Sequence, residues 1–263
     1  FHKELKSVIL LLLQKKMNKK INFLGIPIDT ITMRETLNRV EQVIASNKQI
    51  HHTVVNASKV VLMQTDEVLE KSVVEADIIN ADGQAIVWAA NLLGQKLPER
   101  VSGIDLMEEL VERSFKKCYK CYFFGAKEEV VTKLVNIYKK QYSGNIIAGY
   151  RNGYFEKNEE EQIAKEISDS GANMLFVAIT SPKKEIFLNT YKNQLQNVNF
   201  IMGVGGSFDV IAGKVKRAPL WMQNFGMEWL YRVIQEPKRM WKRYLIGNTK
   251  FILLVVKEFF RAK

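Results

Sequence analysis

From residue 21 onward, short apolar runs alternate with longer runs in which apolar residues recur every three or four positions. The short runs are rich in β-branched and aromatic residues and predict strands, whereas the longer runs predict amphipathic helices. The expected strands span residues 21–26, 53–56, 78–81, 121–125, 146–150, 174–179 and 200–203. This alternation predicts an α/β fold with a mostly parallel sheet and flanking helices, in which ligands bind beyond the carboxyl ends of the strands.

Two short patterns predict helix starts. Thr32 and Glu35 have the spacing of a capping box, in which the side chain of each residue bonds the backbone of the other. Ser102 and Asp105 resemble a second box, at the start of a run that contains Leu106. We therefore expect a helix to begin at each place.

The pattern changes after Gly213. No strand is predicted there, and residues 219–260 have the periodicity of helices interrupted near Pro237 and Gly247, because proline and glycine disfavour helix interiors. We therefore divide the chain into an α/β domain, residues 17–212, and a helical appendage, residues 213–263. Met17 resembles a natural start, so residues 1–16 are interpreted as a translated leader or a cloning remnant.

Positive charge is concentrated in the appendage. Of the net charge of +11, residues 213–263 supply +9, with twelve Lys/Arg against three Asp/Glu. Aromatic residues interleave with these cations, namely Trp221, Trp229, Tyr231, Trp241 and Tyr244. Such a segment suits an anionic membrane surface, although an amphipathic helix docked on the body is an alternative. The sequence contains no run of about 18 apolar residues, so it predicts no membrane-spanning helix.

Two charged residues lie where the predicted sheet would present them to a ligand. Asp82 stands in Asn-Ala-Asp-Gly, between a predicted strand and a predicted helix, where a carboxylate could act as a general base on an acceptor hydroxyl. A helix N-cap is its structural alternative. Arg100 lies in the loop 98–103 and suits bidentate phosphate binding, unless it is a solvated loop residue.

Three further strand-to-helix turns are candidate binding loops. Residues 202–209 read Met-Gly-Val-Gly-Gly-Ser-Phe-Asp, and such glycines let a ligand approach the backbone next to a helix N-terminus. This loop matches neither GxGxxG nor a P-loop, so a tight turn without a ligand stays open. Gly125 lies in a similar turn, and Asn56 lies in a third, where it could bond a ligand or cap the next helix.

Cysteine and histidine usage argues against metal or redox chemistry. Cys118 and Cys121 are the only cysteines in the sequence and straddle the start of a predicted strand. No second cysteine pair accompanies them, and no Asp-x-Asp pair follows an apolar strand. We therefore expect no metal site, no cofactor and no disulfide framework, which fits a reducing cytosol.

Four segments, in chain order, carry a family resemblance: NADGQAIVWAA, LPERVSGIDL, GVGGSFDVIAGKVKRAP and EWLYRVIQEPKR. Together they resemble the bacterial WecG/TagA/CpsF glycosyltransferase family, over about residues 21–250. Members include N-acetylmannosamine transferases of wall teichoic acid linkage-unit synthesis. The resemblance implies a Rossmann-like α/β fold and an inverting, metal-independent transfer from a UDP-sugar to an undecaprenyl-diphosphate-linked sugar.

The resemblance also implies roles for individual residues. Asp82 stands at the position of the proposed catalytic base, Arg100 at that of an arginine near the donor diphosphate, and Asn56 at that of an active-site asparagine. The loop 203–209 would border UDP, and arginines of the appendage would close over the site. The positions so implied are Gly203, Gly205, Gly206, Ser207, Asp209, Arg232, Arg239 and Arg243, with Lys242 as an alternative to the last.

One position departs from the family pattern. Residues 181–185 read Ser-Pro-Lys-Lys-Glu, where members usually read Pro-Lys-Gln-Glu, so Lys184 replaces a glutamine expected in the active site. A cation with three donors and no acceptor replaces a neutral amide, and it could neutralise a diphosphate or contact an acidic sugar. The donor therefore stays open between UDP-N-acetylmannosamine, its uronate, UDP-glucose and another UDP-hexose.

The expected partners are a UDP-sugar, a lipid-linked acceptor and the anionic inner face of the plasma membrane, in teichoic acid, cell-wall or exopolysaccharide synthesis. A homo-oligomer stays open.

Two rival functions explain fewer of the sequence features. An NAD-dependent oxidoreductase would need GxGxxG at the first strand turn, where residues 24–29 read Leu-Gly-Ile-Pro-Ile-Asp. A nucleic-acid-binding module would explain the basic tail but would leave Asp82 and Arg100 without a role, so we expect no nucleic acid.

Overall fold

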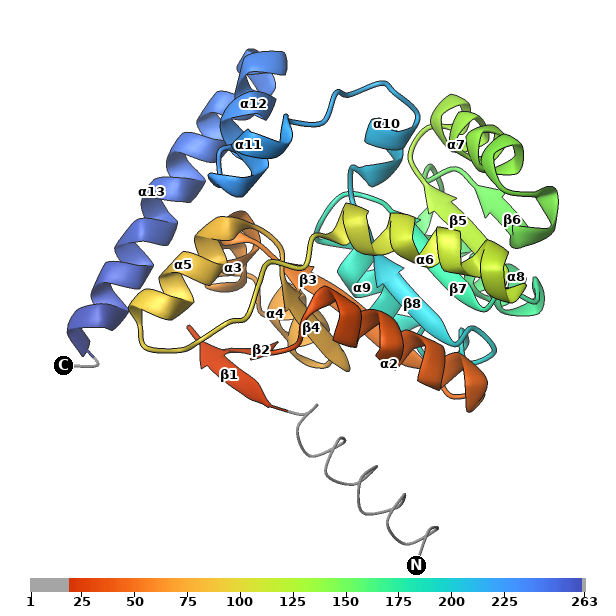
Figure 1. Cartoon of the computed structure of the whole chain (residues 1–263), viewed down its shortest axis with the longest axis horizontal. Helices are drawn as coiled ribbons and strands as arrows, with labels where there is room; N and C mark the ends of the chain where they lie inside the picture. The colour runs from red at the N-terminus through yellow and green to blue at the C-terminus, as the bar shows by residue number, and fades with distance from the viewer. Residues whose placement is uncertain (1–18, 262–263) are drawn as a thin grey trace, which may run out of the picture.

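The computed structural model describes residues 19–261, apart from the side chains of residues 239, 240 and 243. The interpretation of residues 1–16 as a leader or cloning remnant lies outside that range. Figure 1 shows an α/β body with one long helix along its flank.

Six strands form a parallel sheet in the order β4-β3-β8-β7-β5-β6. They are β3 (Ile50–Val55), β4 (Ile78–Ala81), β5 (Cys121–Gly125), β6 (Ile147–Arg151), β7 (Met174–Ala178) and β8 (Phe200–Gly203). The predicted strands 78–81, 121–125 and 200–203 have the observed bounds, and the other predictions for this sheet are within three residues at each end. The α/β class and the mostly parallel sheet are therefore confirmed.

The first predicted strand, residues 21–26, is wrong as a single element. Instead, β1 (Lys20–Phe23) and β2 (Ile26–Asp29) form a separate antiparallel hairpin. Leu24 and Gly25 turn the chain with φ angles of 52° and 88°, as the central residues of a tight two-residue hairpin require. A leucine in the first of these positions gives no turn signal, so the apolar run looks continuous.

Helices cover both faces of the sheet (Figure 1). One face carries α2 (Met33–Ala45), α6 (Gly103–Lys117), α7 (Glu128–Gln141) and α10 (Ser207–Ile211). The other carries α3 (Ala57–Met63), α4 (Glu67–Val74), α5 (Gln84–Leu92), α8 (Glu160–Asp169) and α9 (Lys183–Thr190). The short 3₁₀ turns η1 (Gly144–Ile146) and η2 (Lys157–Glu159) precede β6 and α8.

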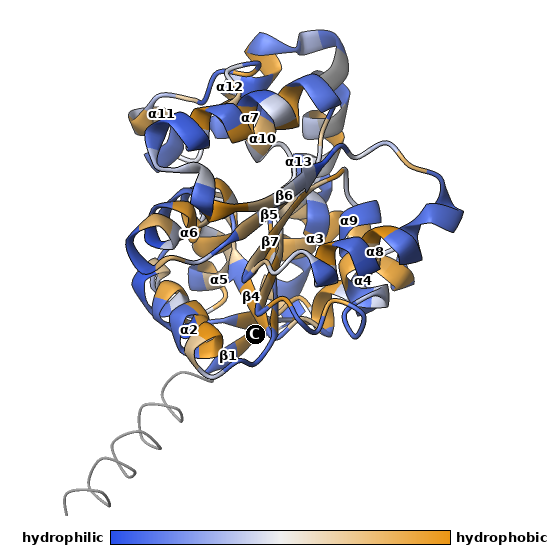
Figure 2. Cartoon of the chain, turned by 90° about the vertical axis from the view of Figure 1, so that its right-hand side faces the viewer, coloured by the Kyte–Doolittle hydropathy of each residue, from blue (hydrophilic) through white to orange (hydrophobic). Residues whose placement is uncertain are grey.

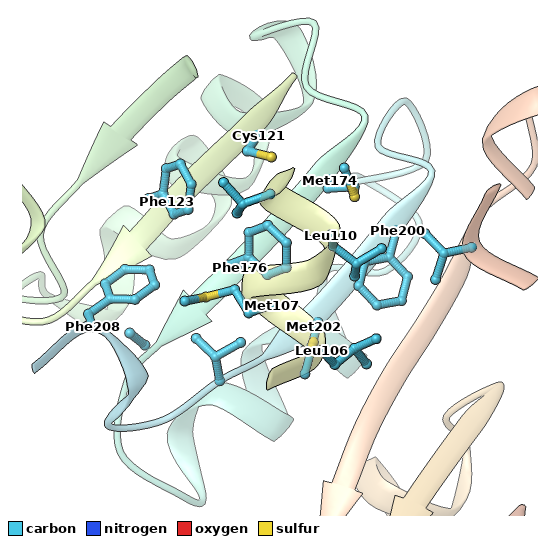
Figure 3. Packing of buried hydrophobic residues seen from close by; sticks show 14 of the residues in the cluster. Leu106, Met107, Leu110, Cys121, Phe123, Met174, Phe176, Phe200, Met202 and Phe208 are labelled. Atoms are coloured by element: carbon cyan, nitrogen blue, oxygen red, sulfur yellow. The ribbon is translucent and has the colours of Figure 1, made fainter. Parts of the chain in front are cut away.

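Strand residues supply the centre of both cores, since successive side chains point to opposite faces. Phe123 packs on the α6 and α7 side, whereas Phe124 packs against Phe155 and Phe187 on the other. Figure 3 shows the first core, where residues of three strands meet α6 and α10: Leu106, Met107, Leu110, Cys121, Phe123, Met174, Phe176, Phe200, Met202 and Phe208. In Figure 2 the hydrophobic colour accordingly runs along the central strands.

One of the two predicted helix caps is confirmed. Thr32 Oγ1 accepts a hydrogen bond from the backbone of Glu35, and the Glu35 carboxylate accepts one from the Thr32 backbone at 2.8 Å. Ser102 is the N-cap of α6 but makes no side-chain cap bond, so the second box is wrong. The carboxylate of Asp105 instead accepts two bonds from Arg217, at 2.5 and 2.8 Å, and such a bidentate ion pair is stronger than a cap bond.

The C-terminal segment forms α11 (Leu220–Asn224), α12 (Glu228–Gln235) and α13 (Pro237–Arg261). The interruption at Pro237 is confirmed, but α13 continues through Gly247, so the second predicted break is wrong. α13 packs along α3, and a Cβ at Gly247 would lie 3.6 Å from Ser58 Oγ. This packing offsets the intrinsic cost of glycine in a helix, about 1 kcal/mol.

Candidate active site

The carboxyl ends of β3, β4 and β8 bring together candidate residues that are far apart in the sequence. β3 pairs with β4 on one side and with β8 on the other. Asn56 follows β3, Asp82 follows β4, and Gly203 ends β8. The backbone N–H of Asp82 donates a hydrogen bond to the Val55 carbonyl at 2.7 Å, which ties the ends of β3 and β4 together.

Asp82 is not the N-cap of α5, so the structural alternative for this residue is wrong. Gly83 occupies the cap position with a φ of +120°, and no side-chain cap bond is made. Such a φ favours glycine, because it has no Cβ. The backbone turn at Gly83 thus starts the helix without using the Asp82 carboxylate, which stays partly buried at the sheet edge.

The Asp82 carboxyl has a raised pKa. Burial raises it to about 6, and the negative charge of Glu228 adds to the effect. The nearby positive charges of Arg100, Arg232 and Lys59 act in the opposite direction. A carboxyl with a pKa near 6 is largely ionised at neutral pH and still basic enough to accept a proton, as a general base requires.

Arg100 is enclosed by side chains from three helices and is not a solvated loop residue. Its side chain is 15% exposed. One guanidinium nitrogen lies 3.5 Å from Glu228 of α12, and the other donates to Gln223 of α11 at 3.4 Å and lies 3.8 Å from Asp105 of α6. The C-terminal helices thus reach Arg100 directly, and they place Glu228 close to Asp82.

Asn56 caps α3, as its structural alternative predicted. Its Oδ1 atom accepts a hydrogen bond from the Lys59 backbone N–H at 3.0 Å. The amide nitrogen of Asn56 is not part of this cap. The cap therefore holds the side chain at the carboxyl end of β3 without excluding a contact between that nitrogen and a ligand.

A buried ionic cluster lies beside this edge, and sequence reasoning missed two of its three members. Glu185 is 2% exposed, with one carboxylate oxygen 2.7 Å from Lys59 Nζ and 2.6 Å from Lys184 Nζ. The Lys59 ammonium also donates to the Val54 carbonyl at 2.5 Å. Although burial by itself raises the pKa of Glu185, the two ammonium groups outweigh it and lower the pKa to about 2. Glu185 is therefore a permanent anion near neutral pH.

Lys184 reaches this cluster across the end of β8. A Cβ at Gly203 would lie 3.0 Å from Lys184 Cδ, so the missing side chain at Gly203 leaves room for the lysine stem. Lys184 is 7% exposed. Its charge is thus held within the body beside Glu185, and Gly203 has a packing role as well as its predicted place in a ligand loop.

The rest of the loop after β8 lies beneath Arg232. Gly205 has a φ of +55°, and a Cβ at Gly206 would lie 3.9 Å from a guanidinium nitrogen of Arg232. Ser207 donates its hydroxyl to the Val204 carbonyl at 2.7 Å. The structure thus brings Arg232, expected from the sequence to bind diphosphate, next to the predicted loop.

Three further predicted residues lie on α10 and α13. Asp209 lies on α10 with its carboxylate 3.4 Å from Lys214 Nζ. Arg239 and Arg243 lie on α13, and their side chains are outside the described part of the structure. Their roles, and that of Lys242 as an alternative, stay predictions.

Gly125 has a clear packing role. Its φ is +127°, and a Cβ there would lie 2.5 Å from the Ala178 backbone, so the close approach of β5 and β7 requires glycine. Four strand spacings separate β5 from β4 in the sheet, about 19 Å. Gly125 therefore does not meet Asp82, and its part in binding stays a prediction.

The two cysteines are free and have different environments. Cys118 is exposed at the end of α6, whereas burial raises the pKa of the Cys121 thiol to about 12. Within residues 19–261, no group of three or more His, Cys, Asp or Glu side chains is placed to hold a metal ion.

Comparison with known proteins identifies relatives along the whole α/β body and beyond. The glycosyl transferase WecG/TagA/CpsF family matches residues 21–263. N-acetylglucosaminyldiphosphoundecaprenol N-acetyl-beta-D-mannosaminyltransferase of Bacillus subtilis (strain 168) is 37% identical over 183 residues, which cover 70% of each chain. The enzyme of the same name from Staphylococcus aureus (strain MW2) is 30% identical over 252 residues, 95% of this chain and 96% of the relative. This chain is therefore a glycosyltransferase and belongs to the WecG/TagA/CpsF family.

Proposed function

We propose that this enzyme transfers an N-acetylmannosamine-type hexose from a UDP-sugar to an undecaprenyl-diphosphate-linked sugar. The observation that carries the proposal is the Asp82 carboxyl, whose pKa is about 6 and which lies at the sheet edge among Arg100, Arg232 and Lys59. The names of the relatives support the lipid-linked acceptor and the N-acetylmannosaminyl group.

In the proposed reaction, Asp82 accepts the proton of the acceptor hydroxyl as that oxygen forms a bond to the anomeric carbon of the donor. The bond from this carbon to UDP breaks on the opposite side, and UDP leaves with the electron pair, so the anomeric configuration inverts. The proton later passes from Asp82 to water. Arg100 and Arg232 supply the positive charge that stabilises the diphosphate, because charge-assisted bonds to phosphate are strong. We propose that these arginines make a metal ion unnecessary.

The identity of the donor sugar is the part of the proposal that Lys184 affects most. Its ammonium is 2.6 Å from Glu185, so a buried carboxylate already partners it. This pairing favours a neutral hexose, such as N-acetylmannosamine, over a uronate that would compete with Glu185 for the same cation. UDP-glucose remains the second candidate, since it is also neutral. Membership of a glycosyltransferase family argues against the NAD-dependent and nucleic-acid-binding rivals.

We further propose that the enzyme binds the inner face of the plasma membrane through its C-terminal helices. Large apolar side chains on these helices are exposed, including Leu220, Trp221, Phe225, Trp229, Ile234, Trp241, Leu245, Ile246, Ile252, Leu253, Val256 and Phe260. They alternate with the twelve Lys/Arg of residues 213–263, which suits an anionic bilayer surface. Every helix within residues 19–261 is too short or too polar to cross a bilayer.

Part of α13 also docks on the body, as the alternative interpretation expected. Phe251 and Val255 are buried, and the Phe251 ring lies 6.3 Å from that of Phe23. Deleting the appendage would therefore expose core residues, so membrane binding is better tested by Trp241→Ser with Leu245→Ser. We expect weaker sedimentation with anionic liposomes and an unchanged melting temperature. Undiminished liposome binding would remove these residues from the membrane contact.

The function is tested by UDP release from a panel of UDP-sugars with a prenyl-diphosphate-linked N-acetylglucosamine as acceptor. We expect acceptor-dependent release from one donor, insensitivity to EDTA, and a loss of about a hundredfold or more in Asp82→Asn. Asp169→Asn, at the exposed end of α8, is the matched control. Equal rates in the wild type and in Asp82→Asn would remove Asp82 from the mechanism.

A further inference from the structure

α5 presents an apolar surface that begins at the candidate active site. The helix starts two residues after Asp82, and it exposes Trp88 and Leu92, which are 52% and 60% accessible. These residues are four positions apart and therefore lie on one side of the helix. With a rise of 1.5 Å per residue, they lie about 6 and 12 Å along α5 from its first residue. Both residues belong to the α/β body and not to the basic C-terminal segment.

The turn between α11 and α12 packs against α5 and carries further exposed aromatic residues. A Cβ at Gly226 would lie 3.1 Å from the Trp88 ring and 3.2 Å from Gln84 Cβ, so the turn rests directly on the first half of α5 (Figure 1). Beside it, Phe225 is 66% exposed, and Trp221 of α11 is 57% exposed. Three large exposed aromatic side chains thus lie on α5, on α11 and in the turn that packs on α5.

The other side of this turn is polar and faces the site. Gln223 is 4% exposed and accepts a hydrogen bond from Arg100 at 3.4 Å. Glu228, two residues after Gly226, lies 3.5 Å from the same guanidinium. The turn therefore contacts Arg100 through Gln223 and Glu228, and it packs on α5 at Gly226.

We propose that α5 and the α11–α12 turn bind the first part of the prenyl chain of the acceptor. The inference rests on the proposed function, because it assigns the hydrocarbon part of that substrate. Such an acceptor has a fixed order of a sugar hydroxyl, a diphosphate and a hydrocarbon chain. The enzyme presents the two ends of this order along one helix, with Asp82 just before the start of α5 and the exposed Trp88 and Leu92 further along it. A polar site that leads into an apolar helix surface distinguishes a prenyl chain from an unspecified apolar partner.

Two acceptors with the same head group test the inference in detergent, where no bilayer contributes. One carries a polyprenyl chain and the other a short alkyl chain. In Trp88→Ser/Leu92→Ser we expect kcat/KM for the polyprenyl acceptor to fall about tenfold, with the loss confined to that acceptor. Tyr154→Ser, which alters an exposed aromatic residue beyond β6, is the matched control. Equal losses with both acceptors, or no loss with either, would overturn the proposal.

A binding measurement separates this inference from the proposed function. Geranylgeranyl diphosphate should bind the wild type more tightly than inorganic diphosphate, and the double variant should lose that preference. This result can be obtained even if every tested donor fails to give UDP release. Equal affinity of the wild type for the two probes would overturn the inference. The inference would also fail if the double variant kept its preference for geranylgeranyl diphosphate but lost liposome binding or self-association. The surface would then contact a membrane or a second copy of the chain.

Discussion

Two carboxylates at the same edge of the sheet have pKa values displaced in opposite directions. The pKa of Asp82, after β4, is raised to about 6, and that of Glu185, on α9, is lowered to about 2. Burial raises both. Glu185 has two ammonium groups within 2.7 Å, whereas Asp82 interacts with its cations only through longer-range charge effects and is opposed by Glu228.

The comparison shows that burial alone does not determine the state of a carboxyl group; the number and closeness of its cations do. A carboxylate with two contacting lysines stays ionised and connects α3 to α9. A carboxylate whose cations act only through longer-range charge effects has a pKa of about 6. We infer that the first group serves structure and that the second serves proton transfer.

The largest expected effect is the loss of stability in Glu185→Gln. Removing the charge leaves Lys59 and Lys184 buried beside a neutral group, so the free energy of unfolding should fall by about 3–5 kcal/mol. Because the folded-state pKa of Glu185 lies below the unfolded value of 4.5, its contribution is present above pH 4.5 and is lost as the pH falls toward 2. Urea unfolding between pH 7 and pH 3 measures the loss of stability in the variant and the pH dependence of the Glu185 contribution. A variant as stable as the wild type at pH 7 would contradict the structural role.

The next largest effect is a gain of stability in Asp82→Asn, opposite in sign to the loss in Glu185→Gln. Asp82 has a folded-state pKa above its ordinary value of 3.8, so its ionisation lowers stability as the pH rises from about 4 to above 6. Asp82→Asn should therefore raise the free energy of unfolding at pH 8 by about 1–2 kcal/mol while it lowers turnover about a hundredfold or more. A variant that is less stable than the wild type at pH 8 would show that the carboxylate is held by favourable contacts.

Lys184→Gln restores the residue usual in the family and tests how many cations Glu185 needs. Lys59 remains 2.7 Å from the carboxylate, so the expected loss of stability is only about 1–2 kcal/mol. Activity with a neutral UDP-hexose should be kept, because the lysine charge is engaged by Glu185. A change of preferred donor in the panel would instead make Lys184 a direct determinant of sugar specificity.

The smallest effect is a shift of the pH–rate profile in Glu228→Gln. Burial continues to raise the pKa of Asp82, but the added repulsion from Glu228 is lost. The acidic limb of kcat/KM, which reports the free enzyme, should move from about pH 6 to lower pH by roughly half a unit. Glu166→Gln, at a distant ion pair with Arg151, should leave the profile in place. If the acidic limb of the kcat/KM profile does not move in Glu228→Gln, then Glu228 of α12 does not influence the pKa of Asp82.

Much of the site could be predicted because its parts stand at strand ends. Apolar runs marked β4 and β8 with the observed bounds, and Asp82 and the glycine loop follow them directly. Lys59 and Glu185 gave no such signal, since a lysine in a first helical turn and a glutamate in a charged run are typical of solvated surfaces. Their contact spans 126 positions, the difference between 185 and 59, and depends on the packing of α9 beside β3 and β8.

The sequence by itself determined the α/β class, the strands of the main sheet, the family and the sheet edge at which the candidate residues lie. Those features depend on local periodicity and on motifs that are contiguous in the chain. Only the tertiary structure decided that the first strand is a hairpin, that α13 passes through Gly247, and that Arg100 meets Glu228. Each of these depends on which distant segments pack together, and packing energies between such segments can outweigh local preferences of about 1 kcal/mol.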